Sequence, residues 1–326
     1  MLPLDINNIF SVNESSFDDL CNTVFQFQYQ YNPIYRQWVD LIDTSPLERK
    51  IPQKIPALPI SFFKEQRVVT GNWQEQKIFE SSGTTGMVTS RHYVADIAIY
   101  EQSFIQGFER QYGSIQNWCV LALLPAYLER ENSSLVYMAN KMIALSGHSE
   151  SGFYLYNYAE LAHKLAELEL KRQPILLLGV TFALLDFSAK FPLHLKHTVV
   201  METGGMKGRG RELTRPELHE TLISRFKLNH VHAEYGMTEL LSQAYSKGNG
   251  RYYCPPWMKV YIRKEDDPFE LLTEGTGLIQ IIDLANIYSC SFIATQDIGK
   301  LYADGSFEVL GRMDHADIRG CSLLVV

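Results

Sequence analysis

Residues 81–86 read Ser-Ser-Gly-Thr-Thr-Gly and follow the strand-like sequence Lys77-Ile78-Phe79-Glu80. Hydroxyl side chains and glycines in such density suit neither a hydrophobic core nor a helix. Glycine lets the backbone N–H groups converge and the hydroxyls add donors, so the stretch predicts a phosphate-binding loop. It is not the P-loop of nucleotidases, which ends in Gly-Lys-Ser/Thr, because Met87-Val88-Thr89 follows here. Taken alone, it is equally well a polar turn.

Further short motifs follow the loop in a fixed order. They are Glu-Thr-Gly-Gly (202–205), Glu-Tyr-Gly-Met-Thr-Glu (234–239), Thr-Gln-Asp-Ile-Gly (295–299) and Gly-Arg-Met-Asp (311–314). The succession resembles the adenylate-forming superfamily of acyl-CoA synthetases, peptide-synthetase adenylation domains and luciferases. Its members carry a Ser/Thr/Gly loop, a Tyr-Gly-x-Thr-Glu signature, a Thr-Gly-Asp and a Gly-Arg-x-Asp hinge. Partial matches in the right order are more specific than any single motif.

Residues 81–92 (SSGTTGMVTSRH), residues 201–209 (METGGMKGR) and the short chain are most similar to the acyl-protein synthetases of bacterial bioluminescence. The resemblance implies an α/β fold, that of the N-terminal domain of adenylate-forming enzymes, with a helical N-terminal part and a small β-rich subdomain. In the superfamily a mobile C-terminal domain follows the hinge and carries a lysine needed for adenylation. We expect that domain to be absent, because the sequence stops at Val326.

The composition predicts a globular protein without a nucleic-acid partner. The 326 residues are 46% apolar and 21% charged, with a net charge of −7, whereas a phosphate backbone calls for a basic face. Five scattered cysteines without a Cys-x-x-Cys pair argue against a disulfide framework and a structural zinc site. Residues 1–13 lack a signal-peptide pattern, and the apolar runs at 118–128 and 174–187 are too short or interrupted for a membrane span. We expect a cytoplasmic protein, and an oligomer is compatible with the sequence.

The sequence changes in character twice along the chain. This predicts a helical segment over 1–65, an α/β nucleotide-binding core over 66–244 and a β-rich subdomain over 245–326. In the first part, Ser16 is the predicted cap of one helix and Asn32-Pro33 the start of another.

In the core, short apolar runs alternate with helical stripes such as Leu161, Leu165 and Leu168, as in a parallel sheet with crossover helices. The predicted strands are 119–124, 174–179, 197–201 and 230–233. In the third part we expect a strand over 275–283 and a hairpin over 299–310 that turns at Asp304-Gly305.

The resemblance assigns the β- and γ-phosphates of ATP to the loop of Ser81, Ser82, Gly83, Thr84, Thr85 and Gly86. Relatives often have a lysine near the end of this loop, where Thr89 stands, and Arg91 or His92 is a candidate for the missing charge. Glu239 resembles the magnesium ligand of the superfamily, since hard carboxylate oxygens suit that ion. Thr238 resembles the hydroxyl that contacts the α-phosphate.

Adenine and ribose are assigned in the same way. Tyr235, followed by Gly236, would stack on adenine, and Gly204 and Gly205 would lie close to the base. Asp297 resembles the acid that accepts hydrogen bonds from the ribose hydroxyls, and Arg312 would join it there. The Thr-Gly-Asp of the superfamily is Thr-Gln-Asp here. Alternatively, Tyr235-Gly236 is an ordinary strand exit and Thr238-Glu239 a helix cap.

The implied reaction is the activation of a carboxylic acid by ATP and Mg²⁺ to an acyl-adenylate, with transfer of the acyl group to a protein thiol. A fatty acid is the expected substrate, because no strand-end acid is placed to meet the ammonium group of an amino acid. An acyl-accepting protein such as a reductase is an implied partner. Two alternatives stay open: an acyl-CoA ligase similar to phenylacetate-CoA ligases, and a nucleotide- or acyl-binding subunit without catalysis.

Cys321 is the predicted acyl acceptor. It lies just past the hinge motif, near the end of the sequence, and a thiolate is a strong nucleophile toward an acyl-adenylate. The acyl-protein synthetases are thought to load the acyl group onto a cysteine near their own C-terminus, and the resemblance carries that role to Cys321. The alternative is a small apolar residue in the run 321–326 that packs against the β-rich subdomain.

Overall fold

The computed structural model describes residues 5–43, 45, 48, 50–81, 89–125, 132–204, 213–264 and 269–313. One six-stranded sheet is parallel except for the strand at one edge, which runs antiparallel to its neighbour. In spatial order the strands are β5 (Gly152–Tyr154), β4 (Cys119–Leu123), β6 (Ile175–Val180), β7 (Thr198–Thr203), β8 (His232–Tyr235) and β9 (Ala244–Ser246). β4 and β6 are buried along their whole length, as is typical of central parallel strands.

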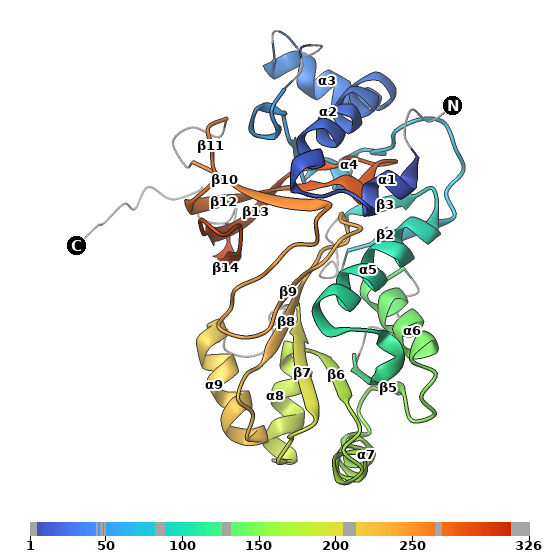
Figure 1. Ribbon diagram of the computed structural model, residues 1–326, viewed down its shortest axis with the longest axis vertical. Helices are drawn as coiled ribbons and strands as arrows, with labels where there is room; N and C mark the ends of the chain where they lie inside the picture. Colours follow the sequence, from blue (N-terminus) through green and yellow to red (C-terminus); the bar gives the residue numbers. More distant parts are fainter. Residues whose placement is uncertain are drawn as a thin grey trace, which may run out of the picture.

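Helices cover both faces of this sheet. They are α5 (Ile97–Tyr112), α6 (Ser134–Ser146), α7 (Tyr158–Leu170), α8 (Thr181–Lys190) and α9 (Arg215–Phe226). Figure 1 shows α8 and α9 on one side of the sheet and α5 and α6 on the other. The predicted stripe of α7 is buried at Leu161, Leu165 and Leu168. The α/β prediction is therefore confirmed, and each predicted core strand lies within two residues of the observed one.

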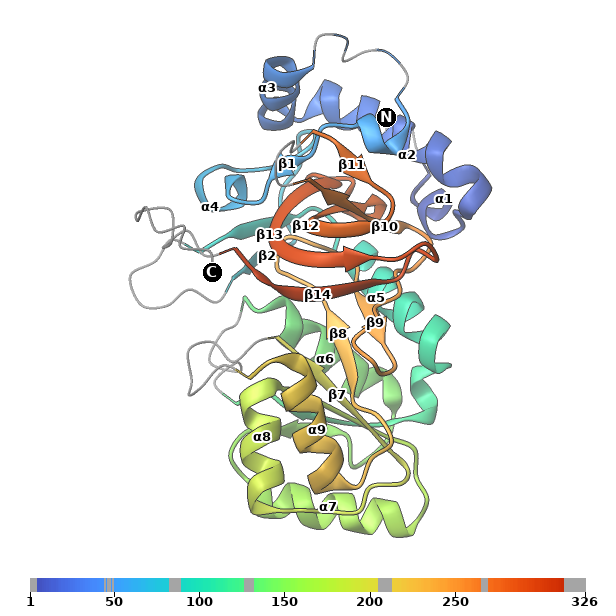
Figure 2. The same cartoon turned by 90° about the vertical axis from the view of Figure 1, so that its left-hand side faces the viewer.

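A second, β-rich sheet has the order β1-β13-β12-β10-β11, and β14 pairs with β13. Its strands are β1 (Leu58–Pro59), β13 (Phe292–Leu301), β12 (Gly275–Asp283), β10 (Met258–Arg263), β11 (Leu271–Leu272) and β14 (Phe307–Arg312). The hairpin between β13 and β14 turns at Asp304-Gly305, as predicted: the Asp304 carboxylate accepts from the Ser306 N–H, and Gly305 has a positive φ of 78°. Figure 2 shows β14 on the side of the α/β sheet and α3 on the opposite side.

The N-terminal helices α1 (Ile6–Phe10), α2 (Glu14–Tyr31) and α3 (Pro33–Ile42) pack on the β-rich sheet. The buried Gln28 amide donates to the carbonyls of Asn286 and Ile287. The predicted cap at Ser16 is wrong. Asn13 caps α2 instead, and Ser16 lies three residues later, where its hydroxyl accepts from the Asn13 N–H in a capping box.

The remaining elements are short. They are η1 (Pro52–Lys54), α4 (Phe62–Glu65), β2 (Lys77–Glu80), β3 (Arg91–Val94), η2 (Ile115–Asn117) and η3 (Leu284–Asn286). β2 and β3 form an antiparallel hairpin on either side of the predicted phosphate loop. Among the described residues, no helix has the length and apolarity needed to cross a bilayer. The domain boundaries at residues 65 and 244 stay a prediction.

Candidate active site

The predicted nucleotide-binding residues that the structure describes gather where the two sheets meet. β7 and β8 are parallel neighbours, so Gly204, which follows β7, and Tyr235, which ends β8, lie at the same edge. Figure 2 shows this edge facing β14, and Asp297 of β13 is paired with Arg312 of β14. Ligand sites of open α/β sheets lie at the carboxyl ends of their strands.

Tyr235 connects the two sheets. Its hydroxyl donates to Asp297 Oδ2 at 2.8 Å, and its ring lies edge-on to Phe307 and tilted against Tyr252. Burial, with the neighbouring Asp297 carboxylate, raises the pKa of Tyr235 well above its usual value, so the hydroxyl stays a donor. Tyr235 thus orients the predicted ribose acid, a contact that the motifs do not indicate.

The other oxygen of Asp297 faces Arg312. Arg312 Nε lies 3.7 Å from Asp297 Oδ1, and the side chains are 62% and 15% exposed, respectively. An ion pair this long and this exposed contributes little to stability, so Arg312 is free to turn toward a ligand. The two residues predicted to bind ribose are therefore adjacent in the structure.

The Thr238-Glu239 pair lies in a turn directly after β8. Glu239 is only 6% exposed, and this burial raises the pKa of its carboxyl, opposed by a hydrogen bond from the Ser90 side chain. His92 Nδ1 lies 2.8 Å from the Thr238 carbonyl and must donate to it, because a carbonyl only accepts. Burial lowers the pKa of His92 to about 4. The prediction that His92 supplies a positive charge is therefore wrong, whereas Arg91 on the same strand is exposed and stays a candidate.

The base of the predicted phosphate loop lies beside Glu239. The Ser81 hydroxyl accepts from the Ser90 N–H at 2.9 Å, and the Ser81 N–H donates to the Ser90 carbonyl at 3.0 Å. Ser90 is itself buried and reaches Glu239 with its side chain. The predicted residues Ser82, Gly83, Thr84, Thr85 and Gly86 lie outside the described residues. The described residues Ser81 and Ser90, which flank this segment, lie next to the predicted metal ligand.

Two glycines of the motifs have a structural reason: Gly204 has a backbone conformation that favours glycine, and Gly236 lies against a neighbouring side chain. Gly204 has a φ of 69°, and its carbonyl accepts from the Thr181 hydroxyl at 2.6 Å. At Gly236, an added Cβ would lie 2.5 Å from Oε1 of Glu234, so a larger residue would displace that carboxyl group. Gly205 lies outside the described residues.

Residues 10–326 match the family model described as "Acyl-protein synthetase, LuxE". The chain belongs to this family. No curated protein sequence matches it. Among solved structures, 2-hydroxyisobutyryl-CoA ligase in an open conformation aligns with a TM-score of 0.61 at 11% identity, over 95% of this chain and 78% of that one. The ATP-bound RpMatB-BxBclM chimera aligns with a TM-score of 0.56 at 15% identity, over 74% of this chain and 49% of that one.

Apo MatB from Rhodopseudomonas palustris aligns with a TM-score of 0.53 at 15% identity, over 72% of this chain and 47% of that one. The match thus spans about half the length of the two MatB-type structures. These likenesses show that the LuxE-family chain has the fold of adenylate-forming enzymes, as expected from its motifs.

Several residues around the site in this LuxE-family chain have no motif to mark them. Asp283, at the end of β12, accepts from the N–H groups of Leu241 and Ser242. Asn286 donates its amide to the Glu239 carbonyl at 2.7 Å. These contacts join residues about forty positions apart, so a reading of local patterns does not find them.

Arg215 is a further residue that the sequence motifs missed. Its Nε donates to Glu202 Oε1 at 3.2 Å, and Nη1 donates to the Val309 carbonyl at 2.9 Å. It therefore connects the end of β7 with β14, the strand that carries Arg312.

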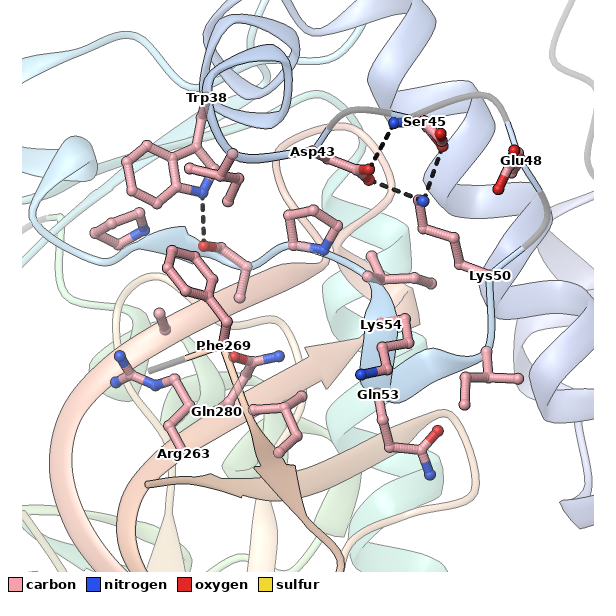
Figure 3. Close-up of a pocket in the computed structure, with 18 residues that line it drawn as sticks. Trp38, Asp43, Ser45, Glu48, Lys50, Gln53, Lys54, Arg263, Phe269 and Gln280 are labelled. Atoms are coloured by element: carbon pink, nitrogen blue, oxygen red, sulfur yellow. Dashed lines mark hydrogen bonds and ion pairs between the residues drawn. The ribbon is translucent and has the colours of Figure 1, made fainter. Parts of the chain in front are cut away.

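A cavity of about 710 Å³ lies away from the motif residues, between α3, residues 50–59 and the β-rich sheet (Figure 3). At one end Lys50 pairs with Asp43 at 2.9 Å, and on another wall Trp38 Nε1 donates to the Ala57 carbonyl. None of the predicted site residues that the structure describes lines it. The cavity is therefore separate from the described residues that are predicted to bind the nucleotide.

The candidate site fits a magnesium ion held jointly with a nucleotide. No group of three or more His, Cys, Asp and Glu in the described residues can hold a metal by itself. Magnesium is usually bound by one or two carboxylates and the phosphates of a substrate. Glu239, next to the base of the phosphate loop, supplies one carboxylate of that kind.

Glu234 makes stability depend on pH. Burial raises its pKa to about 7, and the Thr203 hydroxyl donates to its carboxyl group. Because the folded state holds this proton more tightly than the unfolded chain, stability falls as pH rises from about 4.5 to 7. Glu234→Gln should therefore gain on the order of 2 kcal/mol over wild type between pH 5 and pH 8 in urea unfolding. The control is Glu220→Gln, on the exposed face of α9, which should show no such gain. If the stability of Glu234→Gln varied with pH in the same way as that of the wild type, Glu234 would not be the source of the pH dependence.

Proposed function

We propose that this chain uses ATP and Mg²⁺ to convert a fatty acid into an acyl-adenylate and then passes the acyl group to a protein thiol. Membership of the acyl-protein synthetase family and the fold of adenylate-forming enzymes support acyl activation. The single observation that carries the proposal is the convergence, at one sheet edge, of the Tyr235–Asp297–Arg312 group and the Glu239–Ser90 contact.

The reaction needs two anions to be brought together. A carboxylate oxygen of the acid attacks the α-phosphorus of ATP, the new P–O bond forms, and the bond to pyrophosphate breaks with its electron pair. Donors and cations that are already oriented lower the barrier, because they need not reorganise as charge develops. The N–H and hydroxyl groups of the 81–86 loop are proposed to bind the β- and γ-phosphates. Arg312, which is exposed and weakly paired, is available to the nucleotide.

The ribose is proposed to bind at Asp297. Its Oδ2 already accepts from Tyr235, which restrains the carboxylate, and its Oδ1 faces Arg312. Thr238 and Glu239 are proposed to bind the α-phosphate and Mg²⁺. When bound, this ion neutralises phosphate charge and polarises the P–O bond. Gly204, Gly205 and the ring of Tyr235 are proposed to bind adenine, beside Gly236.

Asp297→Asn should raise the KM for ATP about tenfold with a smaller change in kcat, because ribose binding acts mainly on the ground state. The matched control is Asp304→Asn in the exposed turn of the same hairpin, which should leave KM unchanged. Equal KM values for Asp297→Asn and wild type would remove Asp297 from the nucleotide site.

The substrate class is tested by pyrophosphate exchange with fatty, aryl and amino acids. We expect exchange with fatty acids. Exchange with an amino acid alone would contradict the assignment of the acid. A parallel reaction with CoA separates the two acceptors, because a CoA ligase forms acyl-CoA, whereas an acyl-protein synthetase labels protein.

A further inference from the structure

We infer that Asp283 is a positioning residue, which holds the Thr238-Glu239 turn in place from the β-rich sheet. The inference rests on the proposed function for its meaning in catalysis. The turn belongs to residues 236–243, between β8 and β9, which are in neither helix nor strand. Such a segment lacks the regular backbone hydrogen bonds of a helix or a sheet that would fix the direction of Glu239.

The backbone of this segment is held mainly by distant residues. The carboxylate of Asp283 accepts from the N–H groups of Leu241 and Ser242 at 2.9 and 3.0 Å and from the Ser242 hydroxyl at 2.6 Å. On the other side, the Asn286 amide donates to the Glu239 carbonyl and His92 donates to the Thr238 carbonyl. Both sides of the turn are therefore fixed.

Asp283 is fully buried, and no ion pair to it is found among the described residues. An ionised carboxylate without a cation is costly to bury unless donors surround it. The local alternative is a cap of the η3 turn, and Asp283 does accept from the Ala285 N–H at 3.2 Å. The three shorter bonds all go to residues 241 and 242 instead. Capping alone does not explain them.

The Ser242 hydroxyl extends this arrangement into the core. Trp257 Nε1 donates to Ser242 Oγ at 3.0 Å and to Ser103 Oγ at 3.1 Å. Trp257 is fully buried, so the end of the segment is attached to α5 and the β-rich sheet together. Asp283 therefore orients Glu239 through Leu241 and Ser242, which follow Glu239 by two and three residues. A shift of the segment would move the carboxylate of Glu239 away from the metal position.

The test compares Asp283→Asn with Asn32→Ala. Asn32 is also fully buried and bonds to the Ser289 carbonyl of the β-rich part, but none of its hydrogen bonds among the described residues goes to 236–243. We expect Asp283→Asn to raise the Mg²⁺ concentration for half-maximal pyrophosphate exchange by tenfold or more, as loss of a residue behind a metal ligand does. Asn32→Ala should lower thermal stability without this shift. A lower amount of folded protein reduces the rate but does not move the half-saturating concentration.

Two further measurements separate the outcomes. In a Glu239→Ala background, Asp283→Asn should have no additional effect on the residual rate, because it acts through Glu239. Hydrogen exchange of a peptide covering 237–243 should be faster in Asp283→Asn, whether or not the enzyme is active. Unchanged exchange of that peptide, or an unshifted Mg²⁺ dependence in an active enzyme, would overturn the inference. A wild type without pyrophosphate exchange on any acid would instead refute the proposed function and the catalytic part of this role. The hydrogen-exchange measurement would still show whether Asp283 fixes residues 237–243.

Discussion

Glu239→Ala is expected to lower the rate of acyl-adenylate formation by about 100-fold or more, because it removes the predicted protein ligand of Mg²⁺. Thermal stability should change little. Burial raises the pKa of the Glu239 carboxyl, so its ionised form is disfavoured in the folded protein and its removal relieves that cost. The measurement is the initial rate of pyrophosphate release at saturating ATP, with the melting temperature recorded alongside.

Glu220→Ala is the matched control for this prediction, because Glu220 is an exposed carboxylate on α9. It should keep the wild-type rate. If Glu239→Ala turned over at the wild-type rate as well, the assignment of the metal ligand would be wrong.

Cys321→Ser is expected to abolish covalent acyl labelling of the protein while adenylate formation continues. In the proposed step the Cys321 thiolate attacks the carbonyl carbon of the acyl-adenylate, the bond to the phosphate oxygen breaks, and AMP leaves. The measurement uses ATP, Mg²⁺ and a labelled fatty acid, followed by hydroxylamine, which cleaves thioesters. Label that persists in Cys321→Ser would contradict the assignment.

The other cysteines are poor alternatives for this role. Cys21, Cys119 and Cys290 are buried, and Cys254 is partly exposed. Burial raises the pKa of Cys119 to about 11 and those of Cys254 and Cys290 to about 12, so little thiolate forms near neutral pH. Cys254→Ser is therefore the matched control and should keep the label. Cys321 itself lies outside the described residues, so its role stays a proposal.

Much of the fold could be predicted because it depends on local patterns. Runs such as the one at β6 are apolar at every position, which is typical of a central parallel strand, and Asp304-Gly305 is a turn dipeptide wherever it occurs. The cap of α2 was misplaced because Asn13 and Ser16 are both good capping residues, and the structure uses them together. The choice between them depends on where the chain enters the helix.

Only the site residues that belong to short sequence motifs could be predicted. Tyr235, Glu239 and Asp297 were identified from short signatures, but the hydrogen bond between Tyr235 and Asp297 joins strands of different sheets. The neutral state of His92 follows from its burial, which a short motif does not reveal. In the sequence, nothing distinguishes Asp283 from other acids at the end of a strand, because its hydrogen-bond partners are distant in the chain.

The central claim is that this LuxE-family chain makes an acyl-adenylate, and direct detection of that product tests it best. The wild type would be incubated with ATP, Mg²⁺ and fatty acids of several chain lengths, with no thiol acceptor added, and the quenched mixture analysed by mass spectrometry. We expect acyl-AMP together with an equal amount of pyrophosphate, and about 100-fold less of both products from Glu239→Ala. ATP that binds, as measured by calorimetry, but yields no acyl-AMP with any carboxylic acid would contradict it and would favour a nucleotide-binding subunit.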